Sequence, residues 1–305
     1  MTRSRQVRVA RLIYLTILAG AFIWLVSTRW DTIGAVFETA RAGWLIVAWI
    51  SSFGLLWWGA AFWSSAMRAL GSPLPVARAV QASARSLLAR YIPGSVWYAV
   101  GRVGLLAKEG FDAARLTTTA ALEIATSIVV VFCLGTATLG IAGALPGGNW
   151  WLIPSLAAAS IALSRPVVNR AIGWWSGRTG RPIPELSGAS YVRFALWMVG
   201  YWIWAAATFS FYLEAFPDIG DWPILEVSGS FMIAWGTGFL APIAPQGLGV
   251  FEGALTALLG VGTDVFIVVA GYRALLVIRD VVANAVAELS SRRSGAARRG
   301  SPQRD

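Results

Sequence analysis

Long apolar runs recur along the chain and are separated by short polar segments rich in arginine, glycine or proline. A helix that crosses a bilayer needs about 20 apolar residues, and several runs approach that length. A soluble domain has no core large enough to bury so many of them. The pattern therefore predicts an all-α polytopic membrane protein with six full spans, at residues 12–28, 43–63, 117–142, 150–164, 192–213 and 264–288.

Two further apolar segments, 84–107 and 227–262, are interrupted in the middle by YIPGS and by APIAPQGLG. Proline removes a backbone donor and glycine loosens a helix, so the freed backbone groups need protein partners or water at membrane depth. Two half-helices folded into a re-entrant hairpin meet this need. We expect two such broken-helix hairpins, which makes eight helices if hairpin arms are counted as spans.

Basic residues are distributed unevenly between the predicted loops. With both termini in the cytoplasm, six crossings place 21 of the 25 basic residues on the cytoplasmic side, and this count includes Arg90 and Arg102 beside the YIPGS interruption. The outer loops are mainly acidic. The predicted order is two spans, a hairpin and a span, and then the same series again. Because each half crosses three times, 1–143 and 144–289 would form an inverted repeat, which is typical of transporters. Unrelated helices remain an alternative, because the halves share little beyond their breaks.

The two ends of the chain differ in character. The first apolar run follows a basic head, as in a secretory signal, but ends in LVSTRW without a small-x-small cleavage pattern, so we expect a retained first span. Residues 290–305 are small, polar and basic, which predicts a disordered cytoplasmic tail after a single transmembrane domain, 1–289. We expect the protein in the plasma (inner) membrane.

Composition excludes several kinds of chemistry. The chain has no histidine and one cysteine, Cys133, which excludes histidine-based triads, histidine-ligated zinc and a disulfide framework. The segment GLGVFEG departs from the dinucleotide fingerprint, and there is no P-loop. We therefore expect no cofactor, no nucleotide and no nucleic-acid partner. The glycines of this segment instead predict a tight turn and a small-residue face, Gly249 and Gly253, that another helix can approach.

Ionisable side chains at membrane depth are costly and usually face a cavity in pairs. They are few here, namely Arg90, Arg102, Glu123, Glu252, Arg273, Arg279 and Asp280. Arg273, Asp280 and Asn284 are spaced by seven and four residues, which places them on one helix face. Glu123 likewise has Thr119, Thr126 and Ser127 on neighbouring turns, which gives a second polar stripe. Both stripes could line a cavity.

These charges also have simpler interpretations. The side chains of Arg90, Arg102 and Arg279 are long enough to reach the cytoplasmic surface. Glu252 and Arg273 could form a structural ion pair that locks the second hairpin to the last span without binding any ligand.

Two motifs stand out at the breaks: YIPGSVWYAVGR, followed by a span with Glu123, and APIAPQGLGVFEGALTALLG, followed by a span with GYRALLVIRD. With these motifs the chain resembles the lysylphosphatidylglycerol synthase transmembrane-region family, also described as flippase-like, over roughly Arg11 to Leu289. The positions that match are Pro93, Gly94, Pro245, Gly247, Gly249, Glu252 and Arg273, and less closely Arg102 and Glu123. Gln246 departs from the family's usual Pro-Gly-Gly and puts a hydrogen-bonding side chain at the turn.

The family includes the membrane half of enzymes that aminoacylate phosphatidylglycerol and move the product across the bilayer. The sequence contains no synthase domain, so the resemblance implies a stand-alone lipid translocator and no enzyme. The partners would be membrane lipids that are anionic or carry phosphate, bound by arginines and by the amides at helix ends. The candidate substrate-binding residues are Arg90, Pro93, Gly94, Arg102, Glu123, Pro245, Gly247, Gly249, Glu252, Arg273 and Asp280.

Two other functions stay open. One is a membrane-embedded polyprenyl-phosphate-dependent transferase that uses Asp31 or Glu38 as a base. The other is a non-catalytic partner in cell-envelope assembly. Whether the chain forms a homo-oligomer or binds a partner from envelope biosynthesis is also open.

Overall fold

The computed structural model describes residues 27, 28, 30–92, 96–145, 152–241, 245–260 and 262–299. The regular elements in these ranges are all helical, as predicted. In chain order they are α2 (Trp30–Glu38), α3 (Ala42–Ala69), α4 (Val76–Ser86), the 3-10 helix η1 (Leu87–Tyr91), α5 (Trp97–Lys108), α6 (Ala113–Ile141), α7 (Leu152–Thr179), α8 (Gly188–Leu213), α9 (Ile224–Phe239), the 3-10 helix η2 (Pro245–Gly247), α10 (Val250–Leu259) and α11 (Thr263–Arg299).

In the described part of the chain, three helices, α3, α6 and α8, are long and apolar enough to cross a membrane. They coincide with three of the predicted spans. α3 packs against α8, and both expose large apolar side chains at helical spacing, such as Ile46 and Ile50 on α3 and Leu196 and Ile203 on α8. Exposed apolar faces of this extent suit contact with lipid.

The other predicted spans differ from the structure or lie outside it. The span at 12–28 falls almost entirely outside the described residues. The run at 150–164 lies mostly in the first half of α7, which continues through Pro166, and α11 continues well past 288. Both predicted spans end where the sequence becomes charged, but charge does not stop a helix. Arginine is a good helix former, and a helix that has already started extends without a nucleation cost.

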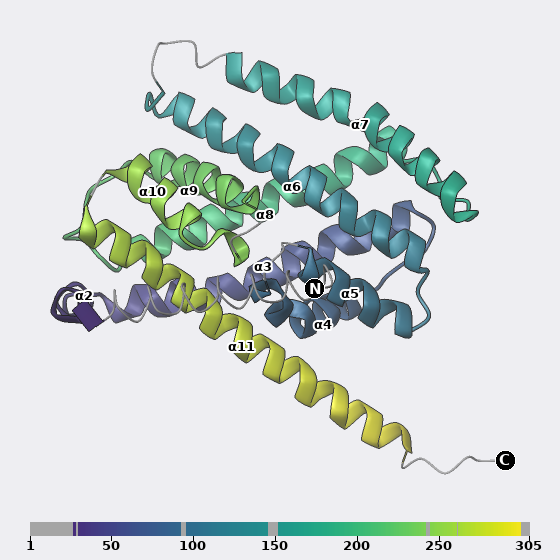
Figure 1. Ribbon diagram of the computed structural model, residues 1–305, viewed down its shortest axis with the longest axis horizontal. Coiled ribbons are helices and arrows are strands. Elements are labelled where there is room, and N and C mark those ends of the chain that lie inside the picture. Colours follow the sequence, from purple (N-terminus) through teal and green to yellow (C-terminus); the bar gives the residue numbers. More distant parts are fainter. Residues whose placement is uncertain are drawn as a thin grey trace, which may run out of the picture.

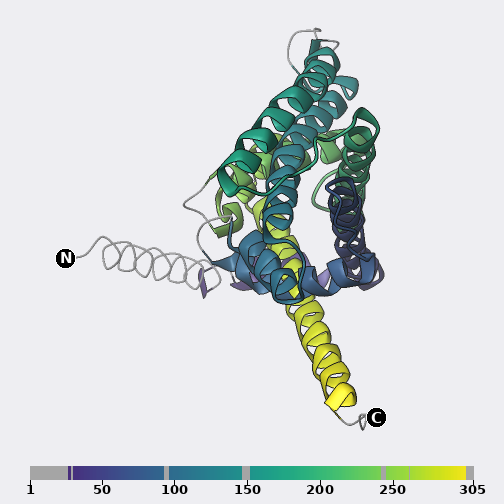
Figure 2. The same cartoon turned by 90° about the vertical axis from the view of Figure 1, so that its right-hand side faces the viewer.

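The helix α11 projects from the rest of the protein toward the C-terminus (Figures 1 and 2). Residues 290–299, which we predicted to be disordered, are its last part. This difference has the same cause, because the segment contains alanines and arginines and follows a helix that is anchored by packing.

Each interrupted segment consists of two α-helices joined through a 3-10 helix. In the first, α4 leads through η1 to α5, and in the second, α9 leads through η2 to α10. The first starts at Val76, earlier than predicted, because α4 is a polar helix that a search for apolar runs does not find. η1 and η2 contact each other, so the two breaks meet.

The glycines of the second broken segment differ from the prediction in one respect. A Cβ atom on Gly249 or Gly253 would have no described atom within 4 Å, so the predicted close approach of another helix is not found there in the part of the chain that the structure describes. The tight turn is confirmed, because Gly247 and Gly249 have φ angles of 66° and 83°. The close approach occurs at Gly247, where a Cβ atom would overlap the backbone of Gly238 in the other arm.

Asp112 caps the N-terminus of α6 outside the apolar part of that helix. Its carboxylate accepts a hydrogen bond from the Arg115 backbone N–H at 2.9 Å and pairs with Arg181 Nη1 at 2.8 Å. The backbone N–H and then Arg181 lower the pKa of Asp112. Because the folded pKa lies below the unfolded value, this stabilisation is complete above the unfolded pKa and is lost as the pH falls through the folded pKa.

Asp112→Ala should therefore lower the free energy of unfolding at pH 7 by about 1 kcal/mol, as is usual for a lost cap. Asp112→Asn keeps a capping oxygen and should cost less. Unfolding curves in detergent measure both effects. The gap between wild type and Asp112→Ala should shrink toward pH 3, and a gap that does not change with pH would contradict the role of the carboxylate.

Candidate functional site

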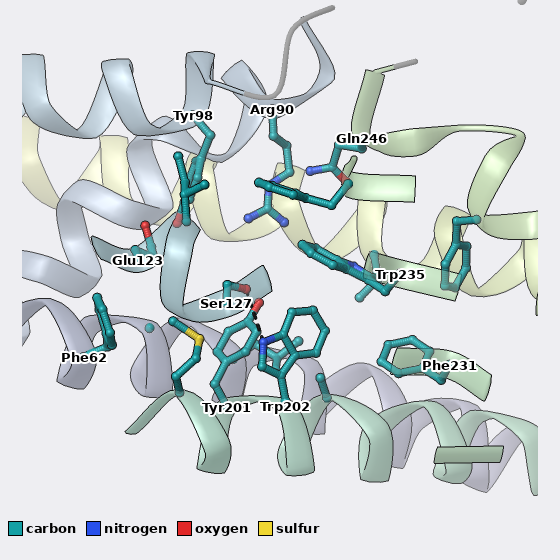
Figure 3. Close-up of a pocket in the computed structure, with 18 of the residues that line it drawn as sticks. Phe62, Arg90, Tyr98, Glu123, Ser127, Tyr201, Trp202, Phe231, Trp235 and Gln246 are labelled. Carbon is teal, nitrogen blue, oxygen red and sulfur yellow. Dashed lines mark hydrogen bonds between the residues drawn. The ribbon is translucent and has the colours of Figure 1, made fainter. Parts of the chain in front are cut away.

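A cavity of about 140 Å³ lies where the two breaks meet. Its wall is formed by α3, η1, α5, α6, α8, α9, η2, α10 and α11, so both broken segments and four long helices contribute to it. Figure 3 shows the Arg90 side chain reaching into this space beside Tyr98 and Gln246, with Ser127 and Tyr201 on the side toward which it points. The wall is mainly aromatic and apolar, but it contains several charged groups.

Arg102 of α5 is completely buried behind the cavity wall. It forms an ion pair with Glu123 of α6 and donates a hydrogen bond to Ser83 Oγ of α4 at 3.1 Å. Its guanidinium group lies 3.9 Å from the ring centre of Trp63 and 4.6 Å from that of Tyr98. Aromatic faces stabilise a cation that has lost its water. Arg102 is therefore an internal group, and the alternative that it reaches for the surface is wrong.

Arg273 of α11 is the main contact of the second break with the last helix. Its Nε lies 3.1 Å from Glu252 Oε1, and its Nη2 donates to the backbone carbonyl of Gln246 at 2.7 Å. Glu252 Oε2 also accepts a hydrogen bond from the Gly249 N–H at 2.6 Å. Gln246 has a φ angle of 50°, a left-handed conformation that costs a non-glycine residue about 1–2 kcal/mol. The ion pair that we gave as a structural alternative is thus present, and it holds a strained turn.

Asp280 of α11 is fully buried and joins two arginines. Its Oδ1 lies 2.6 Å from Arg279 Nε, and its Oδ2 lies 3.4 Å from Arg90 Nη1 and accepts a hydrogen bond from the Tyr91 hydroxyl at 2.9 Å. Arg279 also donates to the backbone carbonyl of Ser52 at 2.8 Å. Since Arg279 is 2% exposed, the interpretation that it reaches the surface is wrong for this residue too.

The polar stripe predicted on α11 contacts both broken segments. Arg273 binds the second break, Asp280 binds the first break through Tyr91, and Asn284 Nδ2 donates to the carbonyl of Arg85 at the end of α4 at 2.9 Å. The common face of these residues is confirmed. One helix therefore connects the two breaks.

Only half of the polar stripe predicted on α6 lies in the cavity wall. Glu123 and Ser127 line the cavity, and Ser127 Oγ accepts a hydrogen bond from Trp202 Nε1 at 3.2 Å (Figure 3). Thr119 and Thr126 are buried and are not part of the cavity wall.

Six predicted site residues gather at the cavity, either in its wall or as ion-pair partners of the wall: Arg90, Arg102, Glu123, Glu252, Arg273 and Asp280. Gly247 and Gly249 form the turn beside it. Pro93 and Gly94 lie outside the described residues. Pro245 begins η2, and nothing is described of its side chain.

Sequence reasoning missed the aromatic partners of the arginines. Tyr98 precedes Arg102 by four residues, which is the spacing of neighbours on a helix face and was an available signal. No local signal pointed to Trp63, which comes from another helix. Asp31 and Glu38, the bases of the alternative transferase, lie exposed on α2 and do not belong to the cavity wall.

Comparisons with known proteins complete the description of the site. The family described as "Lysylphosphatidylglycerol synthase TM region" matches residues 11–278. A comparison with curated proteins gives no match. The matched range contains both broken segments and Arg273, and it ends directly before Arg279 and Asp280.

Proposed function

The chain belongs to the lysylphosphatidylglycerol synthase transmembrane-region family, and from this membership we propose that it moves an anionic phospholipid or a lipid-linked phosphate between leaflets. The headgroup would pass through the cavity where the two breaks meet. The observation that carries the proposal is the charge at this cavity. Among the described residues there, four arginines stand against three carboxylates, which leaves one positive charge in excess. A buried cation without a counter-charge is costly, and phosphate is a favoured partner of arginine.

The contacts between helices support an inverted repeat, in which α3, α4, α5 and α6 correspond to α8, α9, α10 and α11. α3 contacts α4 as α8 contacts α9, and α5 contacts α6 as α10 contacts α11. α6 packs on α9 as α11 packs on α4. The two broken segments would then be re-entrant hairpins from opposite sides. Transporters with such repeats place their binding site near the midplane and open it to each side in turn.

We also propose that both termini are cytoplasmic, in the plasma membrane. Three ion pairs join segments that the charge distribution assigns to the inside: Arg78–Glu109, Arg85–Glu288 and Arg181–Asp112. At the opposite ends of the spans, the Arg41 N–H donates to the carbonyl of Ala215, which joins the start of α3 to the end of α8. The charge assignment and the contacts therefore agree on which helix ends lie together.

The lipid tails would stay in the bilayer while the headgroup crosses. Near the first break, Val96, Trp97 and Val100 of the turn and α5 are exposed, whereas Ala99 and Arg102 on the other face are buried. This arrangement suits a lipid whose acyl tails lie against the exposed apolar face while its headgroup lies in the charged interior.

Leaflet exchange in proteoliposomes tests the proposal. Liposomes with labelled phospholipids of several headgroups should show faster exchange of anionic lipids with wild-type protein than without protein. Arg273→Ala and Glu252→Gln remove the contacts that hold the second break, and each should slow exchange about tenfold or more, since a charge-assisted hydrogen bond contributes about 1.5–3 kcal/mol.

Arg78→Ala is the matched control, because Arg78 is an exposed arginine that pairs with Glu109 away from the cavity. This variant should exchange lipid as wild type does. Wild-type exchange no faster than in empty liposomes, for every headgroup, would contradict the proposal.

A further inference from the structure

The four arginines at the cavity differ in how completely they are paired. Arg102, Arg273 and Arg279 each have a carboxylate within 3.1 Å, and each donates a further hydrogen bond to a nearby oxygen. Their positive charges are matched, and their guanidinium groups are fixed in place. These three arginines stabilise the breaks and the helices around them.

Arg90 is paired much less completely. Its contact with Asp280 is 3.4 Å long, and Asp280 is already engaged by Arg279 at 2.6 Å and by the Tyr91 hydroxyl at 2.9 Å. The buried Nε atoms of Arg90, Arg102 and Arg279 all lack a hydrogen-bond partner among the described residues, so Arg90 differs from the other two in its ion pair and not in its Nε. Arg90 is also the most exposed of the four, with 20% of its side chain accessible in a cavity that it lines. The excess positive charge is therefore located on Arg90.

From these contacts we infer that Arg90 is the residue that binds the ligand's phosphate, and that the ligand is a phosphodiester with a single negative charge. This inference rests on the proposed function, since it specifies the site through which a headgroup would pass. A single negative charge neutralises the excess on Arg90. A phosphomonoester that carries two negative charges would leave one of them buried without a partner, which is unfavourable.

The surroundings of Arg90 fit such a ligand. Its guanidinium group lies 4.7 Å from the ring centre of Tyr98, which fixes its plane, and 20% of the Arg90 side chain stays accessible. Ser127 and Tyr201 line the same cavity and carry hydroxyl groups that can bind the polar remainder of a headgroup (Figure 3). The ionisable groups that interact with Arg90 are Asp280, Tyr98, Tyr201, Tyr91 and Arg273. Glu123 and Arg279 line the same cavity, and Glu252 pairs with Arg273.

Binding rather than transport tests the inference. Isothermal titration of purified protein with dihexanoyl-phosphatidylglycerol, a short-chain phosphodiester lipid, should show binding that Arg90→Gln weakens at least tenfold. Arg90→Lys keeps the charge but loses the forked donor, so its affinity should be intermediate. Arg78→Gln, the surface control, should bind as wild type does. Glycerophosphoglycerol has the same phosphodiester without acyl chains, and it should bind through Arg90 but more weakly.

Dihexanoyl-phosphatidic acid tests the charge of the ligand. Its phosphomonoester gains a second negative charge with a pKa of about 6, so its affinity should fall between pH 5.5 and 7.5. Phosphatidylglycerol does not titrate in this range, and its affinity should stay constant, which controls for ionisable groups of the protein. Phosphatidic acid that binds more tightly at pH 7.5 than at pH 5.5, while phosphatidylglycerol does not change, would overturn the inference.

The melting temperature of Arg90→Gln shows whether weaker binding comes from a lost ligand contact or from unfolding of the protein. In Arg90→Gln the Asp280 carboxylate keeps Arg279 and Tyr91, so the melting temperature should stay close to that of wild type. If the glutamine variant unfolds, a folded Arg90→Lys variant with wild-type affinity would still overturn the inference. The same holds if Arg90→Gln binds normally or if glycerophosphoglycerol does not bind.

The experiments can contradict the Arg90 binding site and the proposed translocation independently of each other. Binding that depends on Arg90, without leaflet exchange above that of empty liposomes, would support the inference and contradict the proposed translocation. Exchange that does not change in Arg90→Gln would contradict the inference and leave translocation standing.

Discussion

Asp280→Asn should lower the free energy of unfolding by about 3–5 kcal/mol, the usual cost of breaking a buried ion pair by removing one partner. The carboxylate is fully buried and is shared by Arg279 and Arg90. Asparagine can still accept a hydrogen bond from Tyr91, but it leaves two guanidinium groups close together without a counter-charge. The first break should then separate from α11. Chemical unfolding in detergent, followed by far-UV circular dichroism, measures the loss.

Glu288→Gln is the matched control, because it removes a carboxylate from the same helix. Glu288 pairs with Arg85 at 2.8 Å but is 38% exposed, and such a pair contributes only about 0–1 kcal/mol. The double variant Asp280→Asn with Arg90→Gln should recover part of the lost stability, because it removes one of the two stranded charges. Equal losses for Asp280→Asn and Glu288→Gln would show that the buried cluster does not hold the first break.

Gly247→Ala should destabilise the second break by about 3 kcal/mol. Two costs add here: the residue has a φ angle of 66°, and a Cβ atom would overlap the backbone of Gly238 in the opposite arm. The arms α9 and α10 would have to separate, and the Gln246 carbonyl would move away from Arg273. Binding of the short-chain phosphodiester should therefore weaken together with stability.

Gly253→Ala provides the control within the same segment. Gly253 lies inside α10, and a Cβ atom there would meet no described atom within 4 Å. Alanine is the better helix former by about 1 kcal/mol, so this variant should be as stable as wild type or slightly more stable. A loss of stability at Gly253 as large as that at Gly247 would contradict the account of the turn.

The membrane-depth charges could be predicted from the sequence because each is an exception in an apolar run. Their spacing also predicted that Arg273 and Asp280 share a face of α11, since helix periodicity fixes that relation locally. Both breaks were visible for a similar reason, because proline and glycine act on the backbone where they stand. These features depend on short stretches of chain.

The pairing between helices could not be predicted in the same way. Nothing local distinguishes Arg90, which is incompletely paired, from Arg102, which is fully buried between Trp63, Tyr98 and Glu123. That difference arises only when α3, α5 and α6 pack together. Helix ends were also predicted poorly, because α4 is polar and α7 and α11 continue through charged residues without a residue that stops a helix.

The central claim is that the headgroup crosses through the cavity between the breaks, and blocking the cavity tests it directly. In a Cys133→Ala background, Ser127→Cys places one thiol in the cavity wall, while Thr117→Cys places one on the exposed face of the same helix. Leaflet exchange of phosphatidylglycerol is measured before and after reaction with a bulky maleimide. The account predicts that labelled Ser127→Cys falls to the rate of empty liposomes while labelled Thr117→Cys keeps its rate. Full exchange after complete labelling of Ser127→Cys would contradict it.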